Sequence, residues 1–282
     1  MDNQQVWFVT GASKGLGLTL TQQLLAAGHK VAATSRTVNA LTGAVGISAS
    51  ENFLPLEVTL TDEESVKLAI LKALEAFGKL DVVVNNAGYG HFGTLEELTD
   101  KESRQNFDIN VFGSLNVIRQ VMPYLRAQRS GKIFNISSIG GYTANFAGWG
   151  IYCATKFAVA GFTEALAAEA KSFGISATVV YPGYFRTSFL TKESMIGPAY
   201  SIAAYEDARA SQQAHANDIN GNQAGDPEKG VAVLIEVAAQ TEVPVHLFLG
   251  QDAYDLAAMK IDVIQQDLES WKTLATATDF DT

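Results

Sequence analysis

A tyrosine and a lysine four residues apart form the first pair in this sequence whose types and spacing could do chemistry. Tyr152 and Lys156 open a stretch with helical spacing, so both side chains are expected on one helix face. A phenol, with a free pKa of about 10, is a feasible proton donor but a poor base near neutral pH. A nearby ammonium group stabilises the phenolate, so we expect Lys156 to lower the Tyr152 pKa. The alternative is that the two side chains only pack at a helix end.

Polar residues near predicted strand ends could complete an acid–base site. Ser137 and Ser138 follow the predicted strand 132–136, at the carboxyl edge where parallel sheets bind ligands. A serine hydroxyl there could orient a substrate oxygen, although loop serines commonly bond their own backbone. Asn110 lies within the predicted helix 101–128, where asparagine is a mediocre helix former. Its diverted backbone bonding could hold a water molecule, but taken alone Asn110 is interpreted as structural.

Three glycines lie where the first predicted strand, residues 6–10, passes into the first predicted helix, residues 16–27. Residues 10–17 read Thr-Gly-Ala-Ser-Lys-Gly-Leu-Gly. Glycine permits positive φ angles and lets backbone N–H groups approach a pyrophosphate, while the helix N-terminus favours an anion. The strand–turn–helix context therefore predicts a dinucleotide site over an ordinary glycine-rich turn.

The residues after the second predicted strand, 31–34, indicate which dinucleotide binds. Ser35 and Arg36 stand where NAD-binding folds usually place an acid for the ribose 2′-hydroxyl. Arg36 could hold a 2′-phosphate through paired hydrogen bonds, and Lys14 in the glycine turn is a second cation within reach. Each cation alone could be an ordinary solvated charge. Together, with the acid missing, they predict NADP.

Strand-length apolar runs alternate with longer amphipathic stretches to about residue 249. This order predicts an α/β fold over residues 1–282, a single domain with a Rossmann-like, doubly wound parallel sheet and helices on both faces. Residues 187–226 lack this alternation and are expected to form an inserted substrate-binding loop or lid. Residues 272–282 are expected to form a frayed tail. Further strands are expected at 53–56, 80–84, 176–181 and 245–249. A capping box at 61–64 predicts a helix that continues to about residue 77, and further helices are expected at 152–173, 227–240 and 253–271.

Composition narrows the classes of protein. With 47% hydrophobic residues, 282 residues can bury one sizeable core, and a net charge of -10 makes nucleic acid an unfavourable partner. The single cysteine, Cys153, forms no intramolecular disulfide and is expected to face away from Tyr152. We expect a soluble, cytoplasmic protein, because no apolar run is long enough for a membrane span and no signal-peptide pattern opens the chain. No metal ligands are expected among the site residues.

Taken in order, these motifs resemble the compact, single-domain branch of the short-chain dehydrogenase/reductases, of carbonyl reductase or ketoreductase type. The resemblance covers residues 5 to about 190 and includes Asn-Asn-Ala-Gly at 85–88 and the pair Pro182-Gly183. It implies four catalytic residues. Tyr152 would be the acid/base, and Lys156 would lower its pKa and bind the nicotinamide ribose. Ser138 would orient the substrate and Asn110 would sustain a water relay from Lys156.

The same resemblance implies the residues at the cofactor, and two positions depart from the family pattern. Ser138 precedes Tyr152 by one residue more than is common, which leaves Ser137 as an alternative, and Glu57 stands where the family often has Asp near adenine. The residues expected at the cofactor are Gly11, Ser13, Lys14, Gly15, Leu16, Gly17, Ser35, Arg36, Glu57, Val58, Asn86, Ala87, Gly88, Tyr152, Lys156, Pro182, Gly183, Phe185 and Thr187.

The resulting hypothesis is an NADPH-dependent hydride transfer between nicotinamide and a ketone or aldehyde, or the reverse from a secondary alcohol. A nucleotide-sugar epimerase and a non-catalytic NADP-binding sensor are the alternatives. In this family helices 101–128 and 152–173 commonly form subunit interfaces, so a homodimer or homotetramer is expected. An apolar or aromatic substrate is favoured by side chains that could instead pack the lid or a subunit contact: Phe189, Met195, Ile196, Tyr200, Tyr205, Gly141, Tyr142, Phe146 and Trp149.

Overall fold

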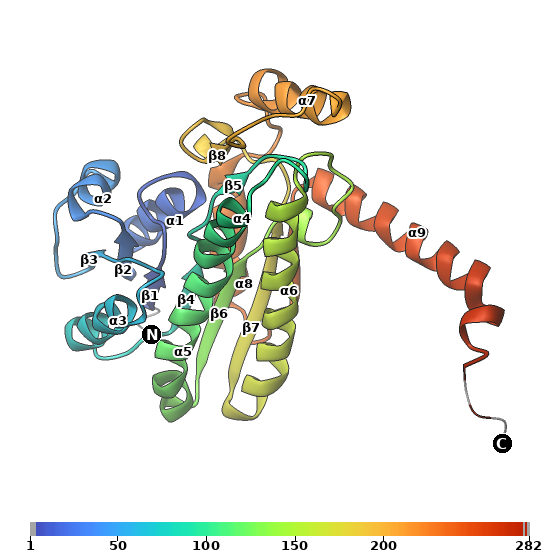
Figure 1. The fold of residues 1–282 in the computed structure, drawn as a ribbon. Coiled ribbons are helices and arrows are strands. Elements are labelled where there is room, and N and C mark those ends of the chain that lie inside the picture. The colour runs from blue at the N-terminus through green and yellow to red at the C-terminus, as the bar shows by residue number, and fades with distance from the viewer. Residues whose placement is uncertain (1–3, 279, 281–282) are drawn as a thin grey trace.

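Seven parallel strands form the central sheet, in the order β3-β2-β1-β4-β6-β7-β9 (Figure 1). The structure is a computed structural model that describes residues 4–278 and 280. Because all seven strands run the same way, their carboxyl ends meet at one edge, and the order reverses beside β1, where such sheets bind ligands. The strands are β1 Val6–Val9, β2 Lys30–Ser35, β3 Phe53–Glu57, β4 Val82–Asn85, β6 Gly131–Ile136, β7 Ile175–Pro182 and β9 His246–Leu249.

Helices cover both faces of this sheet and enclose two hydrophobic cores. One core lies under α1 (Gly15–Ala26), α2 (Val38–Val45) and α8 (Pro227–Ala239). The other lies under α3 (Glu63–Phe77), α5 (Gly113–Gln128) and α6 (Gly150–Ala170). Strands β1 and β4 are buried along their whole length, as their continuous apolar sequences predict. The doubly wound α/β fold expected from the sequence is therefore confirmed, with α2 as an additional helix.

The expected helix 101–128 is three consecutive helical segments. Helix α4 (Asp100–Phe107) is followed by a π-helical turn, Asp108–Phe112, and then by α5. Thr99 and Glu102 form a reciprocal capping box at the start of α4. The π-helical turn contains Asn110, so the helix does depart from regular α geometry where the sequence predicted diverted backbone bonding.

Two expectations about helix ends are wrong. Asp62, not Thr61, caps α3, because the Asp62 carboxylate accepts the backbone N–H of Glu64 at 3.0 Å. Helix α9 (Gln251–Ala275) ends four residues beyond the end predicted at residue 271. Among the described residues, no helix combines the length and the apolar character that crossing a membrane requires.

Residues 187–226, called the cover segment below, lie over the carboxyl edge of the sheet (Figure 1). The segment is more ordered than the expected loop, since it contains helix α7 (Glu206–Gln213) and the short strand β8 (Met195–Ile196). Strand β8 pairs with β5 (Gly90–His91), which follows β4. Strands this short carry no apolar pattern, so the sequence did not predict this connection between the cover segment and the body of the molecule.

Candidate active site

A cavity of about 900 Å³ runs along the carboxyl edge of the sheet beneath the cover segment. It brings together most of the residues expected at the cofactor and the reacting groups, although they are spread along the chain. Gly17, Glu57 and Asn110 are not part of its lining. The expected residues that line it are Gly11, Ser13, Lys14, Gly15, Leu16, Ser35, Arg36, Val58, Asn86, Ala87, Gly88, Ser138, Tyr152, Lys156, Pro182, Gly183, Phe185 and Thr187.

The glycine turn lies against the turn that follows β4. Gly11 has a φ of +67°, and a Cβ atom there would lie 2.8 Å from the Cα of Ala87, so only glycine fits. Gly17 faces Asn86, whose amide donates to the carbonyl oxygens of Thr10 and Gly11 at 2.9 and 3.0 Å. Gly17 therefore allows close packing beneath the turn. The backbone N–H groups of the first residues of α1 are available to a ligand in the cavity.

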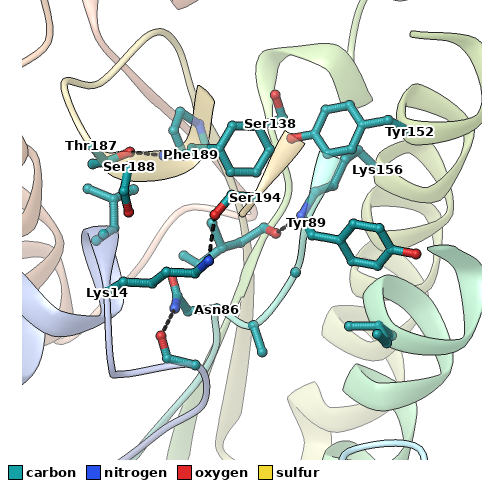
Figure 2. Close-up of a pocket in the computed structure, with 18 of the residues that line it drawn as sticks. Lys14, Asn86, Tyr89, Ser138, Tyr152, Lys156, Thr187, Ser188, Phe189 and Ser194 are labelled. Carbon is teal, nitrogen blue, oxygen red and sulfur yellow. Dashed lines mark hydrogen bonds between the residues drawn. The ribbon is translucent and has the colours of Figure 1, made fainter. Parts of the chain in front are cut away.

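Two cations lie at the end of the cavity next to the glycine turn. Burial lowers the pKa of Lys14, repulsion by Arg36 lowers it further, and Glu193 opposes the change. The Lys14 Nζ donates to the Ser194 hydroxyl of the cover segment at 2.6 Å (Figure 2). Because Lys14 and Arg36 are close enough to repel each other, an anion bound between them would stabilise both.

Ser138, Tyr152 and Lys156 lie together at another part of the same cavity (Figure 2). The Lys156 Nζ donates to the carbonyl oxygen of Ile136 at 2.9 Å and lies 5.8 Å from the centroid of the Tyr152 ring. The hydroxyl groups of Tyr152 and Ser138 lie close to each other, and the Ser138 hydroxyl acts to lower the Tyr152 pKa. These three side chains therefore form one polar cluster that faces the cavity.

The charge states of this cluster follow from its burial. Burial raises the pKa of Tyr152 well above its usual value, and the hydrogen bond with Ser138 only partly opposes the rise. Burial also lowers the pKa of Lys156, to about 8. Desolvation is the main cause of the Tyr152 pKa shift, so the expected lowering of this pKa by Lys156 stays a prediction. At neutral pH the phenol is protonated, which is the form that can give a proton to a carbonyl oxygen.

The structure distinguishes the two serines. Ser137 is buried and its hydroxyl donates to the backbone carbonyl oxygen of Lys156 at 2.8 Å, so it fixes the start of α6. Ser138 is only half-buried, accepts the backbone N–H of Gly140 at 3.1 Å and faces Tyr152. Ser138, rather than Ser137, is therefore placed to contact a substrate.

Asn110 lies behind the cavity wall and connects the chain after β4 to α6. Its side-chain oxygen accepts the backbone N–H of Tyr89 at 3.0 Å. Its side-chain nitrogen donates to the Tyr89 carbonyl and to the Thr155 hydroxyl, each at 3.0 Å. A Cβ atom on Gly88 would lie 3.0 Å from the Asn110 side chain and 3.5 Å from the Lys156 Nζ. Asn110 is thus close to Lys156, while its role in a water relay stays a prediction.

An aromatic wall next to Tyr152 was only partly predicted. Of the candidate substrate contacts, Phe146, Trp149, Phe189 and Ile196 line the cavity. Met195, Gly141 and Tyr142 are not in the lining, and the hydroxyls of Tyr200 and Tyr205 instead donate to Glu96. The latter two tyrosines therefore fasten the cover segment to the body.

Tyr184 and His215 also line this wall, and the sequence analysis missed them. The Nδ1 of His215 lies 2.7 Å from the Ser211 carbonyl oxygen, which can only accept, so Nδ1 carries the proton. The Nε2 of His215 then accepts the Tyr184 hydroxyl at 2.9 Å. The ring of His215 packs on Trp149 with centroids 4.9 Å apart. A histidine within a segment expected to cover a pocket was the signal that could have identified this pair.

Cys153 lines the cavity as well, although it was expected to face away from it. The side chain is buried within the aromatic cluster around Trp149, and burial raises the pKa of its thiol to about 12. A thiol with that pKa stays protonated at neutral pH and is a poor nucleophile. Among the described residues, no group of three His, Cys, Asp or Glu side chains could hold a metal ion.

Comparisons with known proteins agree with this geometry. The model of the short chain dehydrogenase family matches residues 5–195. The oxidoreductase BOA17 of Botryotinia fuckeliana is 35% identical over 277 residues, covering 97% of this chain and 99% of its own. The 3-ketodihydrosphingosine reductase of Bacteroides thetaiotaomicron is 35% identical over 248 residues, covering 87% of this chain and 88% of its own. A solved short-chain dehydrogenase from Streptomyces avermitilis is 34% identical with a TM-score of 0.89, covering 98% of this chain and 100% of its own.

Proposed function

Because the chain belongs to the short-chain dehydrogenase/reductase family, we propose that this oxidoreductase uses NADPH to reduce a ketone or aldehyde to an alcohol. The observation that carries the proposal is the continuous cavity. It joins the glycine turn and two cations to a protonated phenol flanked by a hydroxyl and an ammonium group. When bound, the nicotinamide supplies the hydride, and the protein supplies position and polarisation.

In this proposal the residues around α6 handle the proton. Tyr152 donates its phenolic proton to the carbonyl oxygen as the hydride reaches the carbonyl carbon. Ser138 hydrogen-bonds the same oxygen and so orients the carbonyl. Lys156 binds the nicotinamide ribose and stabilises the phenolate that is left behind, since it retains most of its charge at neutral pH. Asn110, next to Lys156 across Gly88, would hold the relay water that returns a proton.

The preference for NADPH rests on Lys14 and Arg36. Both line the cavity at its glycine-turn end, and the Arg36 charge lowers the pKa of Lys14. A 2′-phosphate carries the charge that relieves this repulsion, whereas a free 2′-hydroxyl does not. Glu57 is exposed and outside the cavity lining, so it is not placed to accept a hydrogen bond from the ribose.

The substrate we infer is an apolar or aromatic carbonyl compound. Trp149, Phe189 and Phe146 present apolar surface beside the phenol of Tyr152, with Trp149 and Phe189 ring centroids 5.5 and 5.7 Å from its ring. Apolar walls with few polar groups favour alkyl and aromatic ligands. The relative named a 3-ketodihydrosphingosine reductase supports a ketone as the reacting group.

The test follows NADPH absorbance over a panel of alkyl and aromatic ketones and aldehydes. Tyr152→Phe is expected to lower turnover at least about a hundredfold, the usual contribution of a positioned proton donor, with NADPH binding unchanged. Tyr142→Phe is the matched control, because Tyr142 packs on Tyr181 and Phe248 outside the cavity lining. Near-normal turnover in Tyr152→Phe would overturn the mechanism. NADPH binding without turnover on any compound would favour a non-catalytic sensor.

The cofactor assignment is tested separately. Wild type should prefer NADPH to NADH, and Arg36→Asp should reduce or reverse that preference, because a carboxylate repels the 2′-phosphate and can accept the 2′-hydroxyl. Equal use of both cofactors by wild type would contradict the role of Arg36. That result would leave the reductase proposal standing.

A further inference from the structure

Helix α9 leaves the body of the molecule after its first two turns (Figure 1). Ala253 and Ala257 are the buried residues of the helix and pack in a small cluster with Ile139. Beyond Ala257 the helix continues to Ala275, which corresponds to roughly 27 Å at 1.5 Å per residue. In Figure 1 this part projects away from α6 and from the sheet.

Apolar side chains recur along α9 at alternating intervals of three and four residues. Such spacing places side chains on one stripe, as at the a and d positions of a coiled coil. The stripe is exposed where it leaves the body: Leu268 is 69% and Trp271 61% accessible. We call it the α9 stripe; it consists of Tyr254, Ala257, Ile261, Ile264, Leu268, Trp271 and Ala275.

We propose that the α9 stripe packs against the same stripe of a second copy of this chain, with the two helices antiparallel. In this order Ile261 faces the partner's Ile264, and Leu268 lies level with the partner's Ala257, against the part of the partner's body that covers that residue. Trp271 then reaches the partner's Tyr254, in the first turn of the other helix. Each large side chain at the exposed end thus meets the position where the partner's helix joins its body.

The arrangement of the bodies favours the antiparallel order. It places the two bodies at opposite ends of the helix pair. A parallel order would bring both bodies to one end, where they would compete for the space beside Ala253 and Ala257. In the antiparallel order Lys260 also falls beside the partner's Asp267, and two-fold symmetry forms this opposite-charge pair twice.

Charge favours a second copy over a membrane surface as the occupant. The helix carries five acidic residues and two lysines. Helices that lie on membranes are typically rich in lysine and arginine, and acidic side chains are repelled by anionic lipids. A second copy buries the same apolar surface and, in the antiparallel order, offers its Asp267 to Lys260.

The first test compares full-length wild type, Leu268→Glu and Met259→Glu by sedimentation velocity. Met259 is the matched control, because it is 63% exposed and lies on the side of α9 away from the stripe. Each chain of Leu268→Glu brings one charged side chain to the contact, so the contact receives two. At concentrations where wild type is fully associated, the variant should halve the mass of the assembly and weaken association at least about tenfold. Met259→Glu should leave the mass unchanged, and carbonyl reduction should be unchanged in both variants.

The second test uses disulfide formation between engineered cysteines, with the buried Cys153 as the sole natural one. A mixture of Tyr254→Cys and Trp271→Cys chains should form a covalent dimer under mild oxidation. Neither variant alone should do so, since the two copies of residue 254 would be roughly 25 Å apart along an antiparallel pair.

Three results would overturn the proposal. An unchanged mass for Leu268→Glu would show that the α9 stripe is not at a subunit contact. Covalent dimers of Tyr254→Cys alone would show a parallel order. Flotation of wild type with vesicles containing anionic lipid, lost in Leu268→Glu with no change in mass, would identify a membrane as the occupant.

Discussion

Replacing Glu97 is expected to release the cover segment from the body without unfolding the sheet. The Glu97 side chain is 0% exposed and accepts two hydrogen bonds from Arg209 of α7 at 2.7 and 2.8 Å. It also accepts the backbone N–H groups of Thr94 and Ile202 at 2.9 and 2.7 Å. Burial acts to raise the Glu97 pKa, but these hydrogen bonds and Arg209 outweigh it, so the pKa is lowered and the carboxylate stays charged.

The size of the effect follows from what Glu97→Ala leaves behind. The Arg209 guanidinium and two backbone N–H groups lose their acceptor. Removing one partner of a buried ion pair costs about 3–5 kcal/mol, and the lower value applies here because Arg209 is 23% exposed and can reach water. A cost of about 3 kcal/mol increases the population of the detached cover segment by roughly a hundredfold.

Hydrogen exchange measured by mass spectrometry checks this expectation. Amides of residues 199–215 should exchange roughly a hundredfold faster in Glu97→Ala, while amides of β1 and β4 keep their protection. The matched control is Glu96→Ala, because the neighbouring Glu96 carboxylate binds only the exposed Tyr205 hydroxyl among the contacts of the described residues. Equal exchange in the two variants would refute the role of the buried pair. Equal acceleration in the sheet would indicate global unfolding instead of local release.

Four further predictions concern the cavity. Gly11→Ala should abolish NADPH binding in a fluorescence titration, at a cost in stability of about 1–3 kcal/mol, because the added Cβ meets Ala87 and φ is +67°; normal affinity would contradict the close approach of the two turns. Carbonyl reduction should fall as pH rises through about 8, where Lys156 loses its proton, and a flat kcat profile to pH 10 would exclude a role for its charge. Folding lowers this pKa, so the contribution of Lys156 to the free energy of unfolding should rise between pH 8 and its unfolded pKa near 10.5. Unfolding of wild type and of Lys156→Met, compared across this pH range, would test the rise. Tyr184→Phe leaves the His215 Nε2 without its donor, so KM should rise several-fold with a smaller change in kcat; a loss as large as in a proton-donor variant would assign Tyr184 to the chemistry.

Much of the fold could be predicted because the signals are local. Buried parallel strands such as β4 are continuous apolar runs, and helices such as α8 begin at a capping residue, here Asp226, followed by Pro227. The order of strands and helices then restricts the topology to a doubly wound sheet. Tyr152 and Lys156 could be paired for the same reason, since four residues make about one helical turn.

Other features depend on contacts between residues far apart in the chain. The choice of Ser138 over Ser137 follows from which hydroxyl the start of α6 already uses. The direction of the Tyr152 pKa shift follows from burial by the aromatic wall, which no local pattern reports. The fastening of the cover segment through Glu97 likewise joins residues more than a hundred positions apart.

The division has one physical reason. Period, turn chemistry and capping are properties of a few neighbouring residues, so the amino-acid order alone predicts the elements and the ends of the strands where function gathers. Solvent exclusion and hydrogen-bond competition arise when distant segments pack together. These contacts decide which serine faces the cavity, whether the Tyr152 phenol keeps its proton at neutral pH, and which face of α9 is left exposed.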